Sequence, residues 1–162
     1  MAVKERTNES SRRGAARILI ADDHDVIRAG LVAMLGKHRR FQICGESSDE
    51  KTLLELIKRL QPDLLILDLF LGHRDGLLLI KDIRQRFPST RVLAICDHGE
   101  NVYALRALGA GASGFLLKQA PHAQFISAVE AILSGTTYLS PECQLLTRHA
   151  PVARSPADRT LA

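Results

Sequence analysis

The chain has 162 residues, of which 46% are hydrophobic and 25% charged, and its formal net charge is +4. This composition is typical of one globular domain, and it excludes a membrane protein because no apolar run approaches the roughly 20 residues that cross a bilayer. The polar N-terminus lacks the apolar centre of a secretory signal, so we expect a cytoplasmic protein with no membrane partner. The three cysteines are widely spaced, which favours reduced thiols over disulfides or a zinc site.

Basic residues concentrate at the two ends of the chain. Residues 1–16 are predicted to form a disordered basic arm, and residues 141–162 a short helix or a linker rich in proline, alanine and arginine. No aromatic residue is interleaved with these charges, which favours solvated tails over a nucleic-acid surface. Residues 17–140 are left as a single domain.

Short apolar runs alternate along this domain with longer segments whose apolar residues recur every three or four positions. The apolar runs predict five strands, at 17–21, 41–46, 63–68, 91–96 and 114–118. The intervening segments predict five helices, with apolar stripes at 27–35, 53–60, 80–87, 102–108 and 125–132. Four strands are apolar throughout, as in a parallel sheet covered on both faces, whereas 41–46 alternates and is expected nearer an edge.

Polar and glycine residues mark the ends of these helices. Starts are predicted at Ser47–Glu50, Asp75–Gly76 and Pro121, and stops at Gly109 and Gly135. Strict alternation of strand and helix predicts an α/β fold, a doubly wound five-stranded parallel sheet with five helices on its two faces.

Ligands of such folds bind outside the carboxyl ends of the strands, so the residues that end each strand are the candidate site. These residues are Asp22 and Asp23 after the first strand, Asp68 at the end of the third, Cys96 and then Asp97 at the fourth, and Lys118 at the fifth. The sequence therefore predicts that acids, a thiol and a lysine converge on one edge of the sheet.

Converging carboxylates need a compensating cation, because two of them about 5 Å apart repel by roughly 3 kcal/mol even at an effective dielectric near 20. Lys118 supplies one positive charge. Mg²⁺ suits the remainder, since it binds through one or two carboxylates, keeps several waters and accepts phosphate oxygens as further ligands. Asp68 could then act as a nucleophile towards phosphorus and form an acyl phosphate. This chemistry leads us to expect Asp68 to be open to solvent.

The segments "ILIADDHDVIRAGL", "LLILDLFLGHRDG", "ALGAGASGFLLK" and "GTTYLSPE" together resemble the receiver domains of two-component response regulators, from about Arg17 to Pro141. The resemblance is closest to the group that carries a LuxR-type helix-turn-helix. It implies a flavodoxin-like sheet of order 2-1-3-4-5. It also implies that Asp22, Asp23 and Asp68 hold Mg²⁺, that Asp68 accepts the phosphoryl group, that Lys118 contacts it, and that Phe115 is the switch aromatic.

The resemblance further implies a switch rather than an enzyme. A sensor histidine kinase would donate the phosphoryl group, and phosphorylation would change the face formed by the fourth helix, fifth strand and fifth helix, with homodimerisation as the output. Haloacid dehalogenase-type phosphatases place a second acid two residues after the nucleophile, where this chain has Phe70. No helix-turn-helix fits after Pro141, so DNA would be read only through a domain absent from this chain. Two alternatives remain: the chain is cut from a longer transcriptional regulator, or the protein acts through contacts of its receiver domain alone.

Two positions depart from the family pattern. Cys96 stands where the family has serine or threonine, and a thiol is a weaker hydrogen-bond donor than a hydroxyl. Gly72 stands where the family has proline, which predicts a looser loop. These departures leave open an alternative function, a protein-interaction module that is independent of phosphorylation. His24 beside the acid pair could ligate a transition metal, but the absence of a second histidine at matching spacing favours a positioning or surface role.

Overall fold

The computed structural model describes residues 14–97 and 101–147. Within these ranges the strands are β1 (Ala16–Ala21), β2 (Phe41–Ser47), β3 (Leu64–Asp68), β4 (Arg91–Cys96), β5 (Gly114–Leu117) and β6 (Tyr138–Leu139). The helices are α1 (Asp25–Leu35), α2 (Glu50–Leu60), α3 (Gly76–Arg86), α4 (Asn101–Ala110), α5 (His122–Leu133) and α6 (Pro141–Thr147). All adjacent strands pair in parallel, in the order β2-β1-β3-β4-β5-β6.

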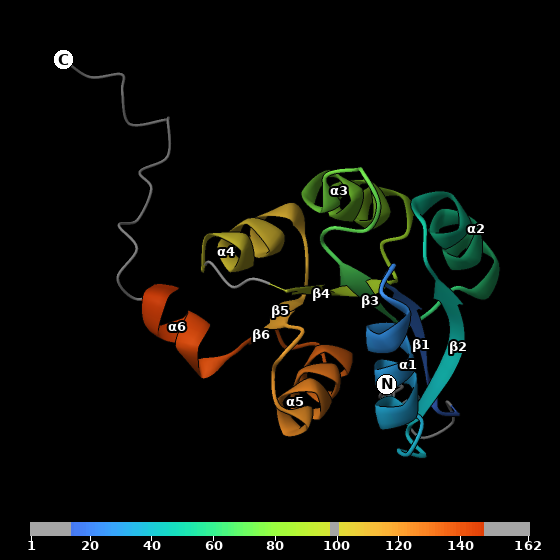
Figure 1. Ribbon diagram of the computed structural model, residues 1–162, viewed down its shortest axis with the longest axis horizontal. Helices are drawn as coiled ribbons and strands as arrows, with labels where there is room; N and C mark the ends of the chain where they lie inside the picture. Colours follow the sequence, from blue (N-terminus) through green and yellow to red (C-terminus); the bar gives the residue numbers. More distant parts are fainter. Residues whose placement is uncertain (1–13, 98–100, 148–162) are drawn as a thin grey trace, which may run out of the picture.

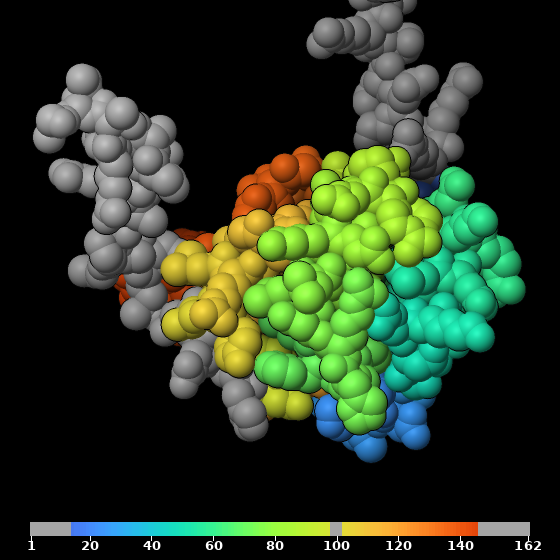
Figure 2. Space-filling view, turned by 90° about the horizontal axis from the view of Figure 1, so that it is seen from above, coloured from blue at the N-terminus to red at the C-terminus, as the bar shows by residue number. Residues whose placement is uncertain are grey.

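Helices cover both faces of the sheet, as the alternating pattern predicts. Helices α2, α3 and α4 lie on one face, and α1 and α5 lie on the other (Figure 1). Figure 2 looks onto the first of these faces, where α2, α3 and α4 lie side by side. The sheet therefore separates two apolar clusters, one on each side.

Strand β3 has a continuous apolar sequence because it is buried on both faces. Successive side chains of a strand point to opposite faces, and both faces of this sheet are covered. Leu65 and Leu67 accordingly belong to the cluster under α2, α3 and α4, whereas Leu64 and Ile66 belong to the cluster under α1 and α5. The alternating strand β2 lies at the edge of the sheet, which confirms its predicted position.

The predicted helix starts are confirmed, and one predicted stop is wrong. Asp49 accepts a hydrogen bond from the Thr52 N–H at 2.8 Å at the start of α2, and Asp75 accepts one from the Leu77 N–H at 2.8 Å at the start of α3. Gly109 lies within α4 and does not end it. The chain turns at Gly111, whose φ of 111° is a conformation that L side chains rarely adopt.

The sheet has a sixth strand among the described residues, where the sequence predicted five. Strand β6 has two residues, which is too short to show a period of two, and it becomes a strand only because the Tyr138 N–H donates to the Ser113 carbonyl at 2.9 Å beside β5. Helix α6 follows and packs against α4. Strand β1 begins at Ala16, inside the predicted arm of 1–16, while residues 1–13 and 148–162 of the two predicted end segments lie outside the described residues.

Candidate functional site

Parallel pairing brings the predicted site residues to one edge of the sheet. Strand β3 ends on Asp68, β4 ends on Cys96, and Asp22 and Lys118 directly follow β1 and β5. In register, Asp68 pairs with Ile95 of β4, so neighbouring strands end at nearly the same height. Residues that are up to 96 positions apart in the chain, Asp22 and Lys118, thus meet at the carboxyl ends of the strands.

Lys118 connects the two buried acids of this site. Its Nζ lies 2.8 Å from Asp22 Oδ2, and it donates a hydrogen bond to Asp68 Oδ2 at 3.0 Å. The three side chains are at most 1% exposed. Lys118 is therefore a counter-ion that the two buried carboxylates share.

Burial changes the pKa values of Asp68 and Lys118. It raises the pKa of Asp68, although a hydrogen bond from the Phe70 N–H to Asp68 Oδ1 at 3.0 Å and the Lys118 contact both oppose the rise. Burial also acts to lower the pKa of Lys118, but the hydrogen bonds and charges of Asp22 and Asp68 outweigh it, so the net pKa is raised. Lys118 therefore keeps its positive charge beside the acids.

Asp23 and His24 complete the cluster on its outer side. His24 Nδ1 lies 3.0 Å from Asp22 Oδ1, 3.1 Å from Asp23 Oδ1 and 3.9 Å from Asp68 Oδ2. One ligand atom from each of the four residues lies within 4.8 Å of all the others. The sequence favours a positioning or surface role for His24 over metal ligation, and its side chain is 55% exposed while its Nδ1 contacts the acids.

The donor set suits a hard divalent cation. Asp22 is 0% exposed, and the Lys118 ammonium, 2.8 Å from its Oδ2, is the charge partner of that oxygen. One ammonium does not balance the three carboxylates of Asp22, Asp23 and Asp68, so the cluster keeps negative charge that a divalent cation would neutralise. Asp22, Asp23 and Asp68 therefore fit Mg²⁺, which takes carboxylate oxygens as ligands.

The expectation that Asp68 is open to solvent is wrong. Its side chain is 1% exposed. Lys118 Nζ lies 3.0 Å and His24 Nδ1 3.9 Å from Asp68 Oδ2, so these two side chains lie against its carboxylate. The His24 side chain is itself 55% exposed.

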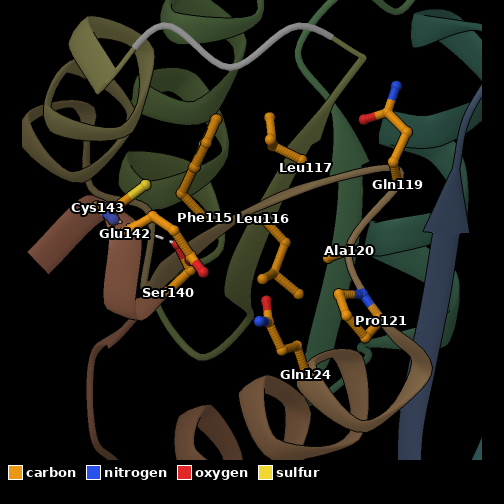
Figure 3. A pocket seen from close by; sticks show the side chains of 10 residues that line it. All are labelled: Phe115, Leu116, Leu117, Gln119, Ala120, Pro121, Gln124, Ser140, Glu142 and Cys143. Atoms are coloured by element: carbon orange, nitrogen blue, oxygen red, sulfur yellow. Dashed lines mark hydrogen bonds between the residues drawn. The ribbon is translucent and has the colours of Figure 1, made fainter.

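Cys96 and Phe115 lie on the same side of the sheet, below α4. Cys96 is 0% exposed and forms no disulfide, and Phe115 is 1% exposed. Both belong to the cluster that also contains Cys143 of α6. A cavity of about 300 Å³ lies beside Phe115 and Cys143, between β5, the start of α5 and the start of α6 (Figure 3). The predicted switch aromatic thus shares an apolar cluster with α6, a segment that the sequence predicts as a short helix or a linker.

The loop after Asp68 adopts a conformation that explains one departure from the family pattern. Gly72 has a φ of +66°, which proline cannot adopt because its ring fixes φ near −65°. The preceding Leu71 is 1% exposed and anchors the loop in the core. At Gly76 an added Cβ would lie 2.2 Å from the Leu69 carbonyl oxygen, so the loop closes tightly at the start of α3.

The fold and the acidic site together define a receiver domain, and comparison with known proteins agrees. The family model of the response regulator receiver domain matches residues 18–130. The chain therefore belongs to the response regulator receiver family.

The curated relatives include proteins named as transcriptional regulatory proteins. The chain is 30% identical over 135 residues to the transcriptional regulatory protein DegU of Brevibacillus brevis, covering 83% of this chain and 57% of the relative. It is 34% identical over 143 residues to the probable transcriptional regulatory protein NarL of Mycobacterium tuberculosis, covering 85% and 66%. The chain spans 57%, 60% and 58% of the length of the DegU protein, the fimbriae Z protein of Salmonella typhimurium and the oxygen regulatory protein NreC of Staphylococcus carnosus.

Solved structures give the same relationship. A LuxR-family two-component response regulator from an Aurantimonas species superimposes with a TM-score of 0.77 at 31% identity, covering 81% of this chain and 94% of that one. The receiver domain of the M. tuberculosis NarL regulator superimposes with a TM-score of 0.71 at 34% identity, covering 76% and 99%. Among the described residues, no helix combines the length and apolar character that crossing a membrane requires.

Proposed function

We propose that this chain is the cytoplasmic phosphoacceptor module of a transcriptional two-component regulator, in which Asp68 accepts a phosphoryl group from a sensor histidine kinase with Mg²⁺ bound at Asp22, Asp23 and Asp68. The observation that carries the proposal is the buried contact of one lysine, Lys118, with both Asp22 and Asp68. The membership of the receiver family supports it.

The proposed reaction is an exchange at phosphorus. An oxygen of the Asp68 carboxylate forms the new O–P bond while the N–P bond of the kinase phosphohistidine breaks, and the bonding electron pair returns to the imidazole nitrogen. Lys118 already donates to Asp68 Oδ2 at 3.0 Å, so its charge lies where negative charge develops on the transferred group. Bound Mg²⁺ supplies further charge stabilisation. The His24 ring has to turn aside, because Asp68 is 1% exposed beneath it.

The proposed output passes through Phe115. Phosphorylation of Asp68 changes the end of β4 at Cys96, and Cys96, Phe115 and Cys143 pack in one apolar cluster. A shift of the Phe115 ring therefore displaces α6, which contributes Cys143 to the same cluster. Val102 and Leu105, which are 50% and 41% exposed, give α4 an apolar outer surface that suits homodimerisation. We propose that DNA is read by a domain outside this chain.

The proposal is tested by phosphorylation in the absence of a kinase. Incubation with a small acyl phosphate and Mg²⁺ should add the mass of one phosphoryl group to the intact protein, and Asp68→Asn should abolish the gain. Asp82→Asn, which alters a partly exposed acid on α3, is the matched control and should be modified as the wild type is. A gain that persists in Asp68→Asn, or no gain in the wild type, contradicts the proposal.

Two observations favour a second candidate, an interaction module that does not use phosphorylation. Asp68 is almost fully covered, and Cys96 replaces the hydroxyl residue that the family uses to hold the phosphoryl group. Sedimentation velocity distinguishes the two functions. A self-association constant that rises with the phosphodonor supports the switch, and one that stays unchanged in a fully phosphorylated sample supports the constitutive module.

A further inference from the structure

The cavity beside Phe115 lies where strand β6 stops covering β5. Strand β6 pairs with β5 at Gly114 and Phe115, so the outer edge of β5 at Leu116 and Leu117 has no strand beside it among the described residues. The cavity of about 300 Å³ lies against this edge, between the start of α5 and the start of α6 (Figure 3). One water takes up about 30 Å³, so the cavity is much larger than a packing defect and has the volume of a small-molecule pocket.

The walls of the cavity are largely apolar and belong to the core. Leu116 of β5 is 1% exposed and Cys143 of α6 is 9% exposed. Pro121 and Gln124 line the cavity from α5, and the Gln124 side chain points towards Leu116 (Figure 3). These walls suit an apolar ring or chain, which gains free energy by leaving water.

The charge of the lining favours a cation. Of the ten described residues that line the cavity, Glu142 alone carries a formal charge, and none is a lysine, an arginine or a histidine. Glu142 is exposed at the start of α6, and hydrogen bonds from its own backbone N–H and from Ser140 lower the pKa of its carboxyl. It is therefore ionised at neutral pH, and an anion in the cavity would have no positive side chain beside it.

The same cavity borders residues that matter to the rest of the molecule. Leu117 lines it, and the next residue, Lys118, donates a hydrogen bond to Asp68 at 3.0 Å. Phe115 and Cys143 also line it and belong to one apolar cluster. A molecule bound here contacts β5, α5 and α6 together.

We propose that this cavity binds a small organic cation, whose apolar body lies against Leu116 and Cys143 and whose ammonium group lies at Glu142, and that the bound cation holds α6 against β5. The inference goes beyond the proposed function, because it requires neither Mg²⁺ nor phosphorylation of Asp68.

Nuclear magnetic resonance titration with three indole compounds of different charge tests the proposal. Tryptamine is the cation, tryptophol its neutral analogue and indole-3-propionate its anionic analogue. Tryptamine should bind with a Kd below about 1 mM, about threefold more tightly than tryptophol and about tenfold more tightly than indole-3-propionate, since an exposed ion pair contributes little. The amides of Leu116 and Leu117 should shift, whereas those of β2, at the opposite edge of the sheet, should not.

Two pairs of variants locate the ligand. Glu142→Gln should bring the affinities of the three compounds to within about twofold of one another, whereas Glu55→Gln, which alters an exposed acid on α2, should keep the order of the wild type. Gln124→Phe should fill the cavity and weaken tryptamine binding at least about tenfold. Ala123→Phe adds the same ring at the exposed neighbouring position and should leave the binding unchanged.

Several results would overturn the proposal. They are no binding of tryptamine, equal affinities of the wild type for the three compounds, an unchanged order in Glu142→Gln, and undiminished binding in Gln124→Phe. The proposed function fails separately. Asp68→Asn should bind tryptamine as the wild type does, so a protein that is phosphorylated at Asp68 but does not bind tryptamine refutes the cavity alone. A protein that binds tryptamine but is not phosphorylated refutes the proposed function alone.

Discussion

The fold buries the carboxylate of Asp68, and burial disfavours its negative charge. Its side chain is 1% exposed, and burial raises its pKa against the opposing effects of the Phe70 N–H and Lys118. The folded protein therefore binds this proton more tightly than the unfolded chain does. Protonation of Asp68 therefore contributes to the free energy of unfolding at low pH. This contribution is lost as the pH rises through the raised pKa of Asp68 in the folded protein.

Asp68→Asn should consequently stabilise the metal-free protein at neutral pH, because it removes a buried charge and keeps the size of the side chain. Thermal unfolding in a chelating buffer should show a higher midpoint for Asp68→Asn than for the wild type at pH 7. The difference should shrink as the pH falls through the raised pKa. Asp82→Asn on the surface should change the free energy of unfolding by less than about 0.5 kcal/mol. A lower midpoint for Asp68→Asn at pH 7 would mean that the pair with Lys118 is net stabilising.

At the scale of single elements, the loop between β3 and α3 depends on a left-handed backbone at Gly72. Its φ is +66°, and an added Cβ there would meet no atom within 4 Å. A side chain at position 72 would therefore destabilise the loop by straining its backbone, and not by a steric clash. Gly30, exposed within α1, has equally open surroundings but helical backbone, so it offers a matched comparison.

Gly72→Ala and Gly30→Ala should have effects of opposite sign. Alanine at 72 should lower the free energy of unfolding by about 1 kcal/mol, because an L residue is strained in the left-handed region. Alanine at 30 should raise it by about 0.5–1 kcal/mol, since alanine loses less backbone entropy than glycine in a helix. Urea denaturation measures both values. Stabilisation by both substitutions would show that the loop does not hold the left-handed conformation in solution.

At the scale of the whole molecule, β6 and α6 close the edge of the sheet next to Phe115. Phe115 pairs with Leu139 of β6, and the buried Cys143 of α6 joins the same apolar cluster. Without these elements β5 would be an edge strand with one side of its ladder unpaired. The receiver core and the segment after it are thus one packed unit as far as Thr147.

A chain ending at Gly135 should therefore be less stable by about 2 kcal/mol, the value of one well-buried apolar side chain. Hydrogen exchange should become faster for the amides of β5, whereas the amides of β2, at the opposite edge, should exchange as in the longer chain. Equal exchange in β5 with and without the last elements would show that β6 and α6 contribute nothing to its protection.

Much of this architecture could be predicted from local pattern. The apolar run of β3, the stripes of the helices and the acid or proline at helix starts follow from period and capping, which are properties of neighbouring residues. The convergence of Asp22, Asp68 and Lys118 also follows, because parallel strands end at one edge. Strand β6 could not be predicted, since two residues carry no period and pair only because β5 lies beside them.

The sequence by itself determined which residues end the strands and that the repulsion between their carboxylates requires a cation. Its family resemblance also determined the order of the sheet. Only the tertiary structure decided that Asp68 is covered, that His24 lies among the acids, and that α6 packs near Phe115. The reason is physical. Which residues end a strand is set by the local chain, whereas burial and side-chain contacts depend on what other segments place within a few ångströms.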